Sequence, residues 1–329
     1  MTALAPTLQT FFTQRLLTQR QVSAHTVAAY RDTFRLLLGF VYEQTGTAPS
    51  KVKFTDLNAT VIGAFLEHLE HVRGNSAPTR NARLAAIHSL FHFAALQHPD
   101  HAALIQRVLA IPPKRYHQRQ VAFLSPEEVN ALLAAPDRTT VLGRRDHALL
   151  VLAVQTGLRV SELTGLRGQD LHLGTGAHVR CHGKGRKERA TPLNDETVAV
   201  LRAWIHDHAP SPEEPAFVSR LNGPLSRDAV ERLVAKYART AARTCPGLNS
   251  KTVTPHVLRH TAAMRLLEAG VDTSVIALWL GHEHVQATQI YVHAHLALKE
   301  QALARTAPPD TKPGRYRPPD TLLAFLEAL

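Results

Sequence analysis

The stretch from His256 to Tyr291 contains residue types that could hold a phosphate group and attack it. His256 and Arg259 stand three residues apart, which places both on one face of a helix. A Gly-His pair follows at His282, and Tyr291 comes nine residues later. A tyrosine at helical spacing is also a common core residue. The elements around these residues must therefore decide between the chemical and the structural interpretation.

Helix signals divide this stretch into two helices and a turn. Thr254 and the proline after it predict the start of the helix that carries the His-Arg pair, and Gly270 predicts its end. Asp272 predicts the start of a short helix that runs to Leu280, and the Gly-His pair then turns the chain toward the tyrosine. The candidate residues would thus lie at the ends and on one face of neighbouring helices.

A second arginine occupies an unusual position upstream. Residues 145–155 predict an apolar helix that ends at the Thr-Gly pair 156–157, and residues 158–163 begin another helix. Arg159 would therefore lie at a helix start, beside amide groups that have no partner within the helix. This is a poor position for a core residue and a good one for an anion ligand.

Three short runs near Leu171, at 178–181 and at 189–193 predict strands, with glycine-containing turns between them. The second turn places Lys184 between two glycines. Most lysines in turns are simply solvated, so the interpretation of Lys184 depends on its neighbours.

The composition predicts a polyanionic partner and two domains. The 329 residues include 38 Lys and Arg against 27 Asp and Glu, which gives a formal charge of +11 and a pI near 10.0. The chain is longer than single cores usually become, and 44% hydrophobic residues suffice for folded cores. Nucleic acid is the leading candidate partner.

Cysteine use and hydropathy indicate the compartment. Cys181 and Cys245 are the only cysteines, so the sequence contains no disulfide framework and no CxxC metal site. The N-terminal residues lack a basic start followed by an apolar segment, and the longest apolar run, 148–154, is too short to span a bilayer. We therefore expect no membrane association and a cytoplasmic, nucleoid-associated protein.

We expect a mainly α-helical fold in four segments. Residues 1–110 predict a helical bundle, with apolar residues at three-and-four spacing in each helix, and residues 111–121 a basic linker. A capping box at Ser125 opens the second domain, 122–298, which is mostly helical with a small three-stranded antiparallel sheet. Residues 299–329 would form a Pro-rich spacer and a C-terminal apolar helix, which we expect to seek a groove on a neighbouring protomer.

The first domain carries the candidate DNA contacts. Residues 1–120 hold 13 Lys or Arg against 6 Asp or Glu, and therefore most of the excess positive charge. Arg80 and Arg83 open a helix and face away from its apolar stripe, and Lys114 and Arg115 belong to the linker. A solvated helix face and a flexible connector are the plain interpretations; contact with a DNA backbone or groove is the functional one.

Four segments resemble the catalytic signatures of the tyrosine recombinases, the phage-integrase and Xer-like family. In family order they read TGLRVSELTGL, GKGRKERATPL, HVLRHTAA and LGHEHVQATQIY. The resemblance covers residues 123–295, and the helical region before it is similar to the family's core-binding domain. It implies a site-specific DNA recombinase or integrase that cuts and rejoins duplex DNA.

Carried onto the matching residues, the resemblance implies that Tyr291 attacks a DNA phosphodiester, forming a 3′-phosphotyrosyl link and releasing a 5′-hydroxyl. Arg159 and Arg259 would bind the non-bridging oxygens with their planar, permanently charged forks. His282 would add a third donor, and His256 would act in proton transfer.

Two further roles are implied for the same site. Lys184 would protonate the leaving 5′-oxygen, and Glu162 would support the first arginine. Each step exchanges one phosphate ester for another, so no nucleotide, metal or other cofactor is required in principle. The implied partner is double-stranded DNA with inverted-repeat recombination sites, bound by a homo-tetramer in synapsis, with paralogous recombinases as possible further partners.

Other interpretations compete with this one. The histidines His282, His284, His293 and His295 suggest a metal site, but they lack the spacing of a helical zinc motif and an acidic cluster. The Arg-His pair at Arg259 resembles that of histidine phosphatases but lacks the glycine that follows there. A type IB topoisomerase-like enzyme would use the same chemistry, and a DNA-binding protein without strand exchange would leave the site unused. The long Pro-rich tail favours a mobile-element recombinase.

Overall fold

The computed structural model describes residues 3–116, 121–182, 188–282, 288 and 291. The chain divides into two compact units, Met1–Arg119 and Gln120–Leu329. Each unit has its own hydrophobic core. Lys184, a candidate site residue, and the C-terminal helix expected at 322–329 lie outside the described residues.

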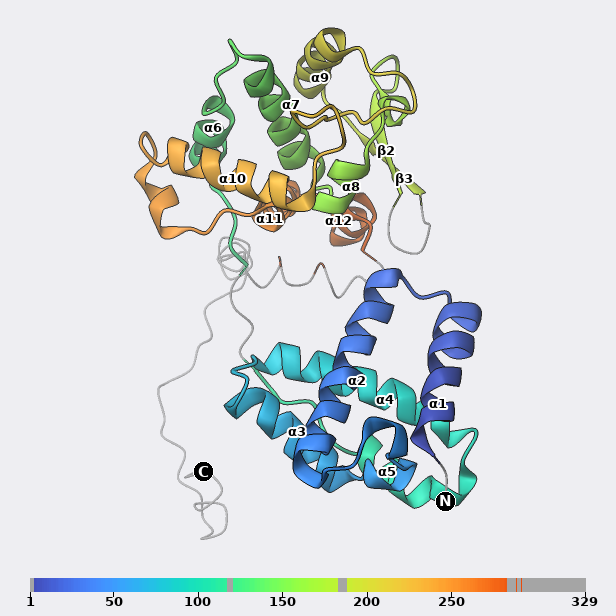
Figure 1. Ribbon diagram of the computed structural model, residues 1–329. Coiled ribbons are helices and arrows are strands. Elements are labelled where there is room, and N and C mark those ends of the chain that lie inside the picture. The colour runs from blue at the N-terminus through green and yellow to red at the C-terminus, as the bar shows by residue number, and fades with distance from the viewer. Residues whose placement is uncertain (1–2, 117–120, 183–187, 283–287, 289–290, 292–329) are drawn as a thin grey trace, which may run out of the picture. The chain divides into compact units, whose positions relative to one another are not determined.

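The named elements of the first unit are all helices over its described residues (Figure 1). Its elements are α1 (Leu4–Thr10), a π-helix (Phe11–Gln19), α2 (Ala24–Thr45), α3 (Ala59–His71), α4 (Ala77–Ala95) and α5 (Ala102–Leu109), with 3-10 turns at Pro49–Lys51, Phe54–Asp56 and Pro99–His101. The α4 helix contacts α2, α3 and α5 and buries Leu84, Ile87, Leu90 and Phe91. This confirms the predicted apolar stripe, whose burial stabilises the bundle.

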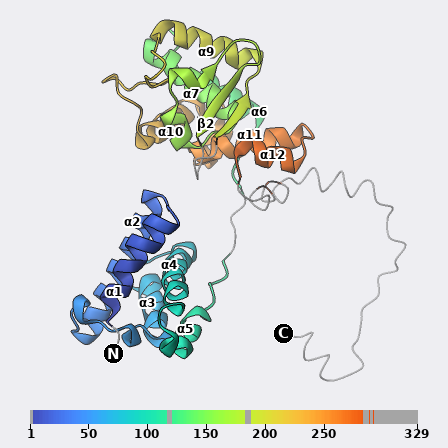
Figure 2. The same ribbon diagram turned by 90° about the vertical axis from the view of Figure 1, so that its right-hand side faces the viewer.

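The second unit combines helices with a small sheet, as expected (Figure 2). Its elements are α6 (Pro126–Ala134), α7 (Val141–Thr156), α8 (Val160–Gly165), β1 (Leu171–His172), β2 (His178–His182), β3 (Glu188–Pro192), α9 (Asp195–His208), α10 (Arg227–Ala241), α11 (Pro255–Glu268) and α12 (Thr273–Leu280), with 3-10 turns at Gly168–Asp170 and Pro246–Ser250. The α7 helix is mostly buried and packs against α6, α9 and α11.

The α7 helix begins earlier than the sequence predicted. The Thr140 hydroxyl accepts from the amide of Gly143 (3.0 Å), so the helix starts at Val141 rather than at Arg145. The glycine in this first turn conceals the helical pattern in the sequence. At the other end Gly157 adopts φ +64°, and a Cβ there would lie 2.7 Å from Leu280 and 3.0 Å from Ala262. Glycine therefore ends α7 and lets α11 and α12 approach closely.

The strands form an antiparallel sheet in the order β1-β2-β3. Val179 of β2 lies opposite Thr191 of β3, and both are fully buried. Two residues further along β2, Cys181 lies opposite Arg189, which comes two residues before Thr191 in β3. Directly opposed residues share a face and side chains alternate, so this register directs Arg189 inward with Thr191.

The first part of the expected linker is held against the first unit. Residues 111–116 form no helix or strand, but the Asn81 amide donates to the Lys114 carbonyl (2.8 Å) and accepts from its amide (2.9 Å). The Lys114 ammonium lies 3.0 Å from the Glu70 carboxylate. These residues therefore lack regular structure, as expected for a connector, but the Asn81 and Glu70 side chains hold them against the first unit. Residues 117–120 lie outside the described part of the chain.

Within the described residues, no helix combines the length and the apolar character needed to cross a membrane.

Candidate active site

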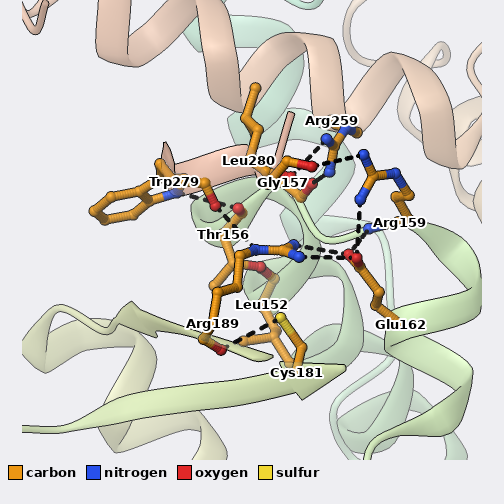
Figure 3. A network of polar contacts seen from close by, with 11 residues as sticks. Leu152, Thr156, Gly157, Arg159, Glu162, Cys181, Arg189, Arg259, Trp279 and Leu280 are labelled. Carbon is orange, nitrogen blue, oxygen red and sulfur yellow. Dashed lines mark hydrogen bonds and ion pairs between the residues drawn. The ribbon is translucent and has the colours of Figure 1, made fainter. Parts of the chain in front are cut away.

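The α11 helix places His256, Arg259 and His260 on one face. The Thr254 hydroxyl accepts from the Val257 amide (3.3 Å) and starts the helix, as predicted. Arg259 is only 3% exposed and donates to the carbonyls of Gly157 and Leu280, each at 2.7 Å. Figure 3 shows this guanidinium between the ends of α7 and α12. Burial, with the charge of Arg159, lowers its pKa to about 10, so it stays charged at neutral pH.

Arg159 occupies the predicted helix start as the N-cap of α8. Its guanidinium donates to Glu162 (3.0 Å) and to the Gly281 carbonyl (3.0 Å), and its backbone amide donates to the Glu162 carboxylate (2.7 Å). The side chain keeps 36% of its surface exposed. Both terminal nitrogens of Arg159 are therefore anchored, while part of the side chain remains accessible.

Arg189 is a site residue that the sequence reasoning missed. Its two terminal nitrogens donate to the two oxygens of Glu162, both at 2.8 Å, and its Nε donates to the Trp279 carbonyl (3.1 Å) (Figure 3). Burial alone would raise the pKa of Glu162, but the bonds and charge of Arg189 hold it below its usual value. Glu162 thus joins Arg159 and Arg189 as a shared carboxylate. The contact of Arg189 with Glu162 depends on the pairing of β2 with β3, so no local signal in the sequence marked it.

His282 follows α12 at the turn formed by Gly281. Its amide donates to the Ala277 carbonyl (2.9 Å), and its Nδ1 lies 2.8 Å from the Thr288 hydroxyl. Burial, then the charges of Arg259 and Arg159, lower the pKa of His282 to about 4. His282 is therefore neutral at pH 7 in the absence of an anion.

Tyr291 lies close to these histidines and is 1% exposed. It packs in a small apolar cluster with residues of α11 and α12. Its hydroxyl lies 3.0 Å from Nδ1 of His260, and its ring is parallel to that of His282 with centroids 6.3 Å apart. Burial raises the pKa of Tyr291, and the charges of Arg259 and Arg159 oppose that shift. The hydroxyl is therefore protonated and shielded.

His260 is the second residue that the sequence reasoning missed as part of a site. Its ring meets the edge of His256 at 4.1 Å between centroids, and burial, His256 and Arg259 lower its pKa to about 4. Burial also lowers the pKa of His256. The spacing of four residues from His256 was the signal, since it puts both rings on one helical face.

An open pocket of about 500 Å³ joins the charged residues. It is lined by Arg159, Val160, Ser161, Arg227, Glu231, Thr254, Pro255, His256 and Arg259. Arg227 and Glu231 come from α10 and were not predicted. The pocket is thus lined by three arginines, one histidine and one carboxylate, Glu231, and the excess of guanidinium groups suits a phosphate.

The predicted DNA-binding residues lie in the first unit. Arg80 and Arg83 are partly buried, and their Nε atoms are buried without a hydrogen-bond partner. A terminal nitrogen of Arg80 donates to the Pro112 carbonyl (3.3 Å). The Arg80 side chain is therefore not simply solvated, because it also contacts the segment after α5. Arg115 is exposed.

Among the described residues, no group of three or more His, Cys, Asp or Glu side chains is arranged to hold a metal ion. His284, His293 and His295 lie outside that part of the chain.

Solved DNA recombinases share this fold. The XerH site-specific recombinase bound to palindromic difH substrate aligns with a TM-score of 0.66 and 22% identity, covering 83% of this chain and 79% of that chain. The Tn1549 transposon integrase in complex with a circular intermediate DNA aligns with a TM-score of 0.67 and 16% identity, covering 91% and 99%. The fold of this chain is therefore that of site-specific recombinases and transposon integrases.

Sequence comparisons give the family. Residues 122–297 match the model "Phage integrase family", and residues 10–98 match "Phage integrase, N-terminal SAM-like domain". "Putative integrase/recombinase y4rC" of Sinorhizobium fredii is 54% identical over 327 residues, covering 99% of this chain and 98% of the relative. "Putative integrase/recombinase y4rD" from the same strain is 38% identical, covering 78% of this chain and 92% of the relative. Tyrosine recombinase XerC of Xanthomonas campestris is 35% identical, covering 87% and 84%. The chain belongs to the phage integrase family and is a tyrosine recombinase, an enzyme that cleaves and rejoins DNA.

Proposed function

We propose that the protein is a mobile-element recombinase that exchanges strands between inverted-repeat DNA sites, with Tyr291 as nucleophile and Arg159 and Arg259 as the phosphate clamp. The observation that carries the proposal is the pocket onto which both guanidinium groups and His256 open. The family supplies the reaction class, and this chain's residues supply the roles below.

The arginines act as preorganised donors. Arg259 is held by two carbonyls and Arg159 by Glu162 and Gly281, and both residues line the pocket, so their guanidinium groups are fixed before an anion enters. A single donor of this kind is worth about 3 to 4 kcal/mol in the transition state. His282 and Lys184 complete the proposed donor set, with Lys184 donating the proton to the leaving 5′-oxygen.

The covalent step conserves a phosphate ester. The tyrosine oxygen bonds to phosphorus while the bond to the 5′-oxygen breaks, and the reverse attack by a 5′-hydroxyl restores the DNA and the tyrosine. Because Tyr291 is buried, its hydroxyl must be uncovered before it meets the DNA. This shielding would keep the nucleophile from unproductive reaction before DNA binds.

The positive charge of the first unit and the nature of the relatives indicate the binding partners. The basic first unit, with Arg80, Arg83, Lys114 and Arg115, would hold the DNA beside the site. Among the structural neighbours, the Tn1549 transposon integrase is in complex with a circular intermediate DNA and XerH is bound to palindromic difH substrate, which supports DNA as the substrate. Four protomers would act in synapsis, in the cytoplasm on the nucleoid. The occurrence of y4rC and y4rD in one strain supports a paralogous partner.

Tyr291→Phe tests the assignment of the nucleophile. The variant should bind DNA with unchanged affinity yet form no covalent adduct on a nicked suicide duplex, because the ring keeps its packing and loses only the attacking oxygen. The duplex would carry a site selected from a randomised library by the wild-type protein. An adduct trapped with the variant would place the nucleophile elsewhere.

A further inference from the structure

Cleavage requires that the tyrosine hydroxyl lose a proton, and the residue that accepts this proton must be in contact with the hydroxyl. The family resemblance implies that Lys184 serves the leaving oxygen and that His256 takes part in proton transfer, but the described hydrogen bond of the Tyr291 hydroxyl joins it to His260. A general base must lie within hydrogen-bond reach of the proton that it removes, at roughly 2.6–3.2 Å between heavy atoms. The geometry around Tyr291 therefore limits the candidates.

His260 is within this reach. Its Nδ1 lies 3.0 Å from the tyrosine hydroxyl oxygen, while the rings meet edge to face at 5.4 Å between centroids. The described hydrogen bond of His282 joins its Nδ1 to the Thr288 hydroxyl, and the His282 ring lies parallel to that of Tyr291. His256 lines the pocket together with the two arginines. The histidines are thus divided between the tyrosine and the phosphate.

We propose that His260 is the general base for Tyr291: its neutral ring accepts the tyrosine proton at Nδ1 during attack and returns it during rejoining. This inference rests on the proposed function, because it takes Tyr291 as the nucleophile. It gives a role to a histidine that the family resemblance left without one, and it assigns His256 to the phosphate side of the site.

The tautomer follows from the contact. For Nδ1 to accept from the hydroxyl, the single proton of the neutral ring must be on Nε2. During attack, the Tyr291 oxygen forms its bond to phosphorus as its proton moves to Nδ1, which leaves His260 with both nitrogens protonated. The 5′-oxygen departs and takes its proton from Lys184. In the reverse step the attacking 5′-hydroxyl returns its proton to Lys184 and His260 gives its proton back to the tyrosine oxygen, so the enzyme is unchanged after a full cycle.

The surrounding charges make this base responsive to DNA. Burial lowers the pKa of His260, and His256 and Arg259 of α11 and His282 after α12, which face it, lower it further, to about 4. The ring is therefore neutral and able to accept a proton before DNA binds. A phosphate between the arginines adds negative charge close by, which favours the protonated ring and so strengthens the base when substrate arrives.

The test compares His260→Asn with His260→Ala in the full-length protein. The Asn oxygen can occupy the position of Nδ1 and accept the same hydrogen bond, but it cannot carry the proton. Single-turnover cleavage is measured on the nicked suicide duplex used for Tyr291→Phe. We expect both variants to cleave about 10²-fold or more slowly than the wild type, with DNA affinity unchanged. His206→Asn, the same change at an exposed position on α9, is the matched control and should cleave normally.

Two further measurements separate a base from a positioning residue. In both His260 variants the cleavage rate should rise about tenfold per pH unit below the pKa of the tyrosine, because hydroxide must replace the lost base. A substrate with sulfur in place of the bridging 5′-oxygen needs no leaving-group acid. It should rescue Lys184→Ala and leave His260→Asn slow.

Each opposite result overturns the proposal. Cleavage by His260→Asn within a few-fold of wild type would mean that the hydrogen bond only orients the ring. Rescue of His260→Asn by the sulfur substrate would place His260 at the leaving group. If Tyr291→Phe still forms an adduct, the proposed function itself fails; if it does not and His260→Asn cleaves normally, only the present inference fails.

Discussion

Arg259 in the second unit and Arg115 in the first are both assigned to DNA, but their surroundings differ. Arg259 is 3% exposed and donates to two backbone carbonyls, whereas Arg115 is exposed beyond the last helix of its unit. A buried, anchored guanidinium is already oriented for one phosphate, and an exposed one can adjust to many. The comparison suggests that the second unit supplies rate and the first unit affinity, and the predictions below test this division.

The largest effect is expected at Arg259. Arg259→Ala should slow cleavage of the suicide duplex by about 10³-fold or more, because it removes several aligned donors at once. Arg259→Lys should recover little of the rate, since an ammonium keeps the charge but not the fork that binds two oxygens. DNA affinity, measured by gel shift, should change far less than the rate.

A stability measurement must accompany this variant. The Gly157 and Leu280 carbonyls lose their donor in Arg259→Ala, and each buried acceptor left unpaired costs about 1–3 kcal/mol. Thermal unfolding then shows whether enough folded protein remains at the assay temperature. Wild-type rates in Arg259→Lys would show that charge alone suffices and would weaken the distinction between the units.

The second-largest effect is expected at the Arg189–Glu162 pair, because Glu162 also accepts a hydrogen bond from Arg159. Arg189→Gln leaves the buried carboxylate without its bidentate partner and should destabilise the protein by about 3–5 kcal/mol. Cleavage should fall by about 10- to 10²-fold through misplacement of Arg159. In the double variant with Glu162→Gln, the combined loss of stability should be smaller than the sum of the single losses, since the two residues form one unit. Additive losses would mean that the pair is energetically independent.

The pH dependence of the free energy of unfolding provides a second measurement on the Arg189–Glu162 pair. Because the folded protein holds the pKa of Glu162 below its usual value, the pair stabilises the fold above the unfolded carboxyl pKa. This contribution is lost as the pH falls through the lower, folded value. Stability should therefore decline on acidification more steeply in the wild type than in Glu162→Gln. Equal slopes would contradict the described ion pair.

Local signals in the sequence predicted the elements, while contacts across the fold were not predictable. The capping residues Ser125, Thr254 and Asp272 start helices in the structure where the pattern indicated, and Arg159 is at a helix start. These signals act over a few residues. The family resemblance then supplied the class of enzyme, which the comparisons confirm; the individual catalytic roles stay predictions.

The missed contacts join residues that are distant in sequence. His260 meets Tyr291 only because α11 and α12 pack closely over Gly157, and Arg189 meets Glu162 through the strand register. Lys114 reaches Glu70 from the expected linker in the same way. Such pairs depend on helix packing and strand pairing, which no short pattern encodes.

The smallest effect is expected in the first unit. Arg83→Ala and Arg80→Ala should each reduce the slope of log affinity against log salt by about one unit per lost phosphate contact, with cleavage rate unchanged at saturating protein. The measurement is fluorescence anisotropy of a labelled duplex over a series of salt concentrations. A slower rate at saturation would assign these residues to the chemistry rather than to affinity.

Lys114→Ala and Arg115→Ala provide a matched comparison within the same segment. The Lys114 ammonium pairs with Glu70, whose side chain is only 15% exposed, so its charge is largely compensated before DNA binds. Arg115 is exposed, and its loss should lower the salt slope more than the loss of Lys114. Equal reductions would mean that DNA displaces Glu70 from the lysine. Glu70→Gln would then raise affinity, because the lysine would no longer have to break an ion pair in order to bind.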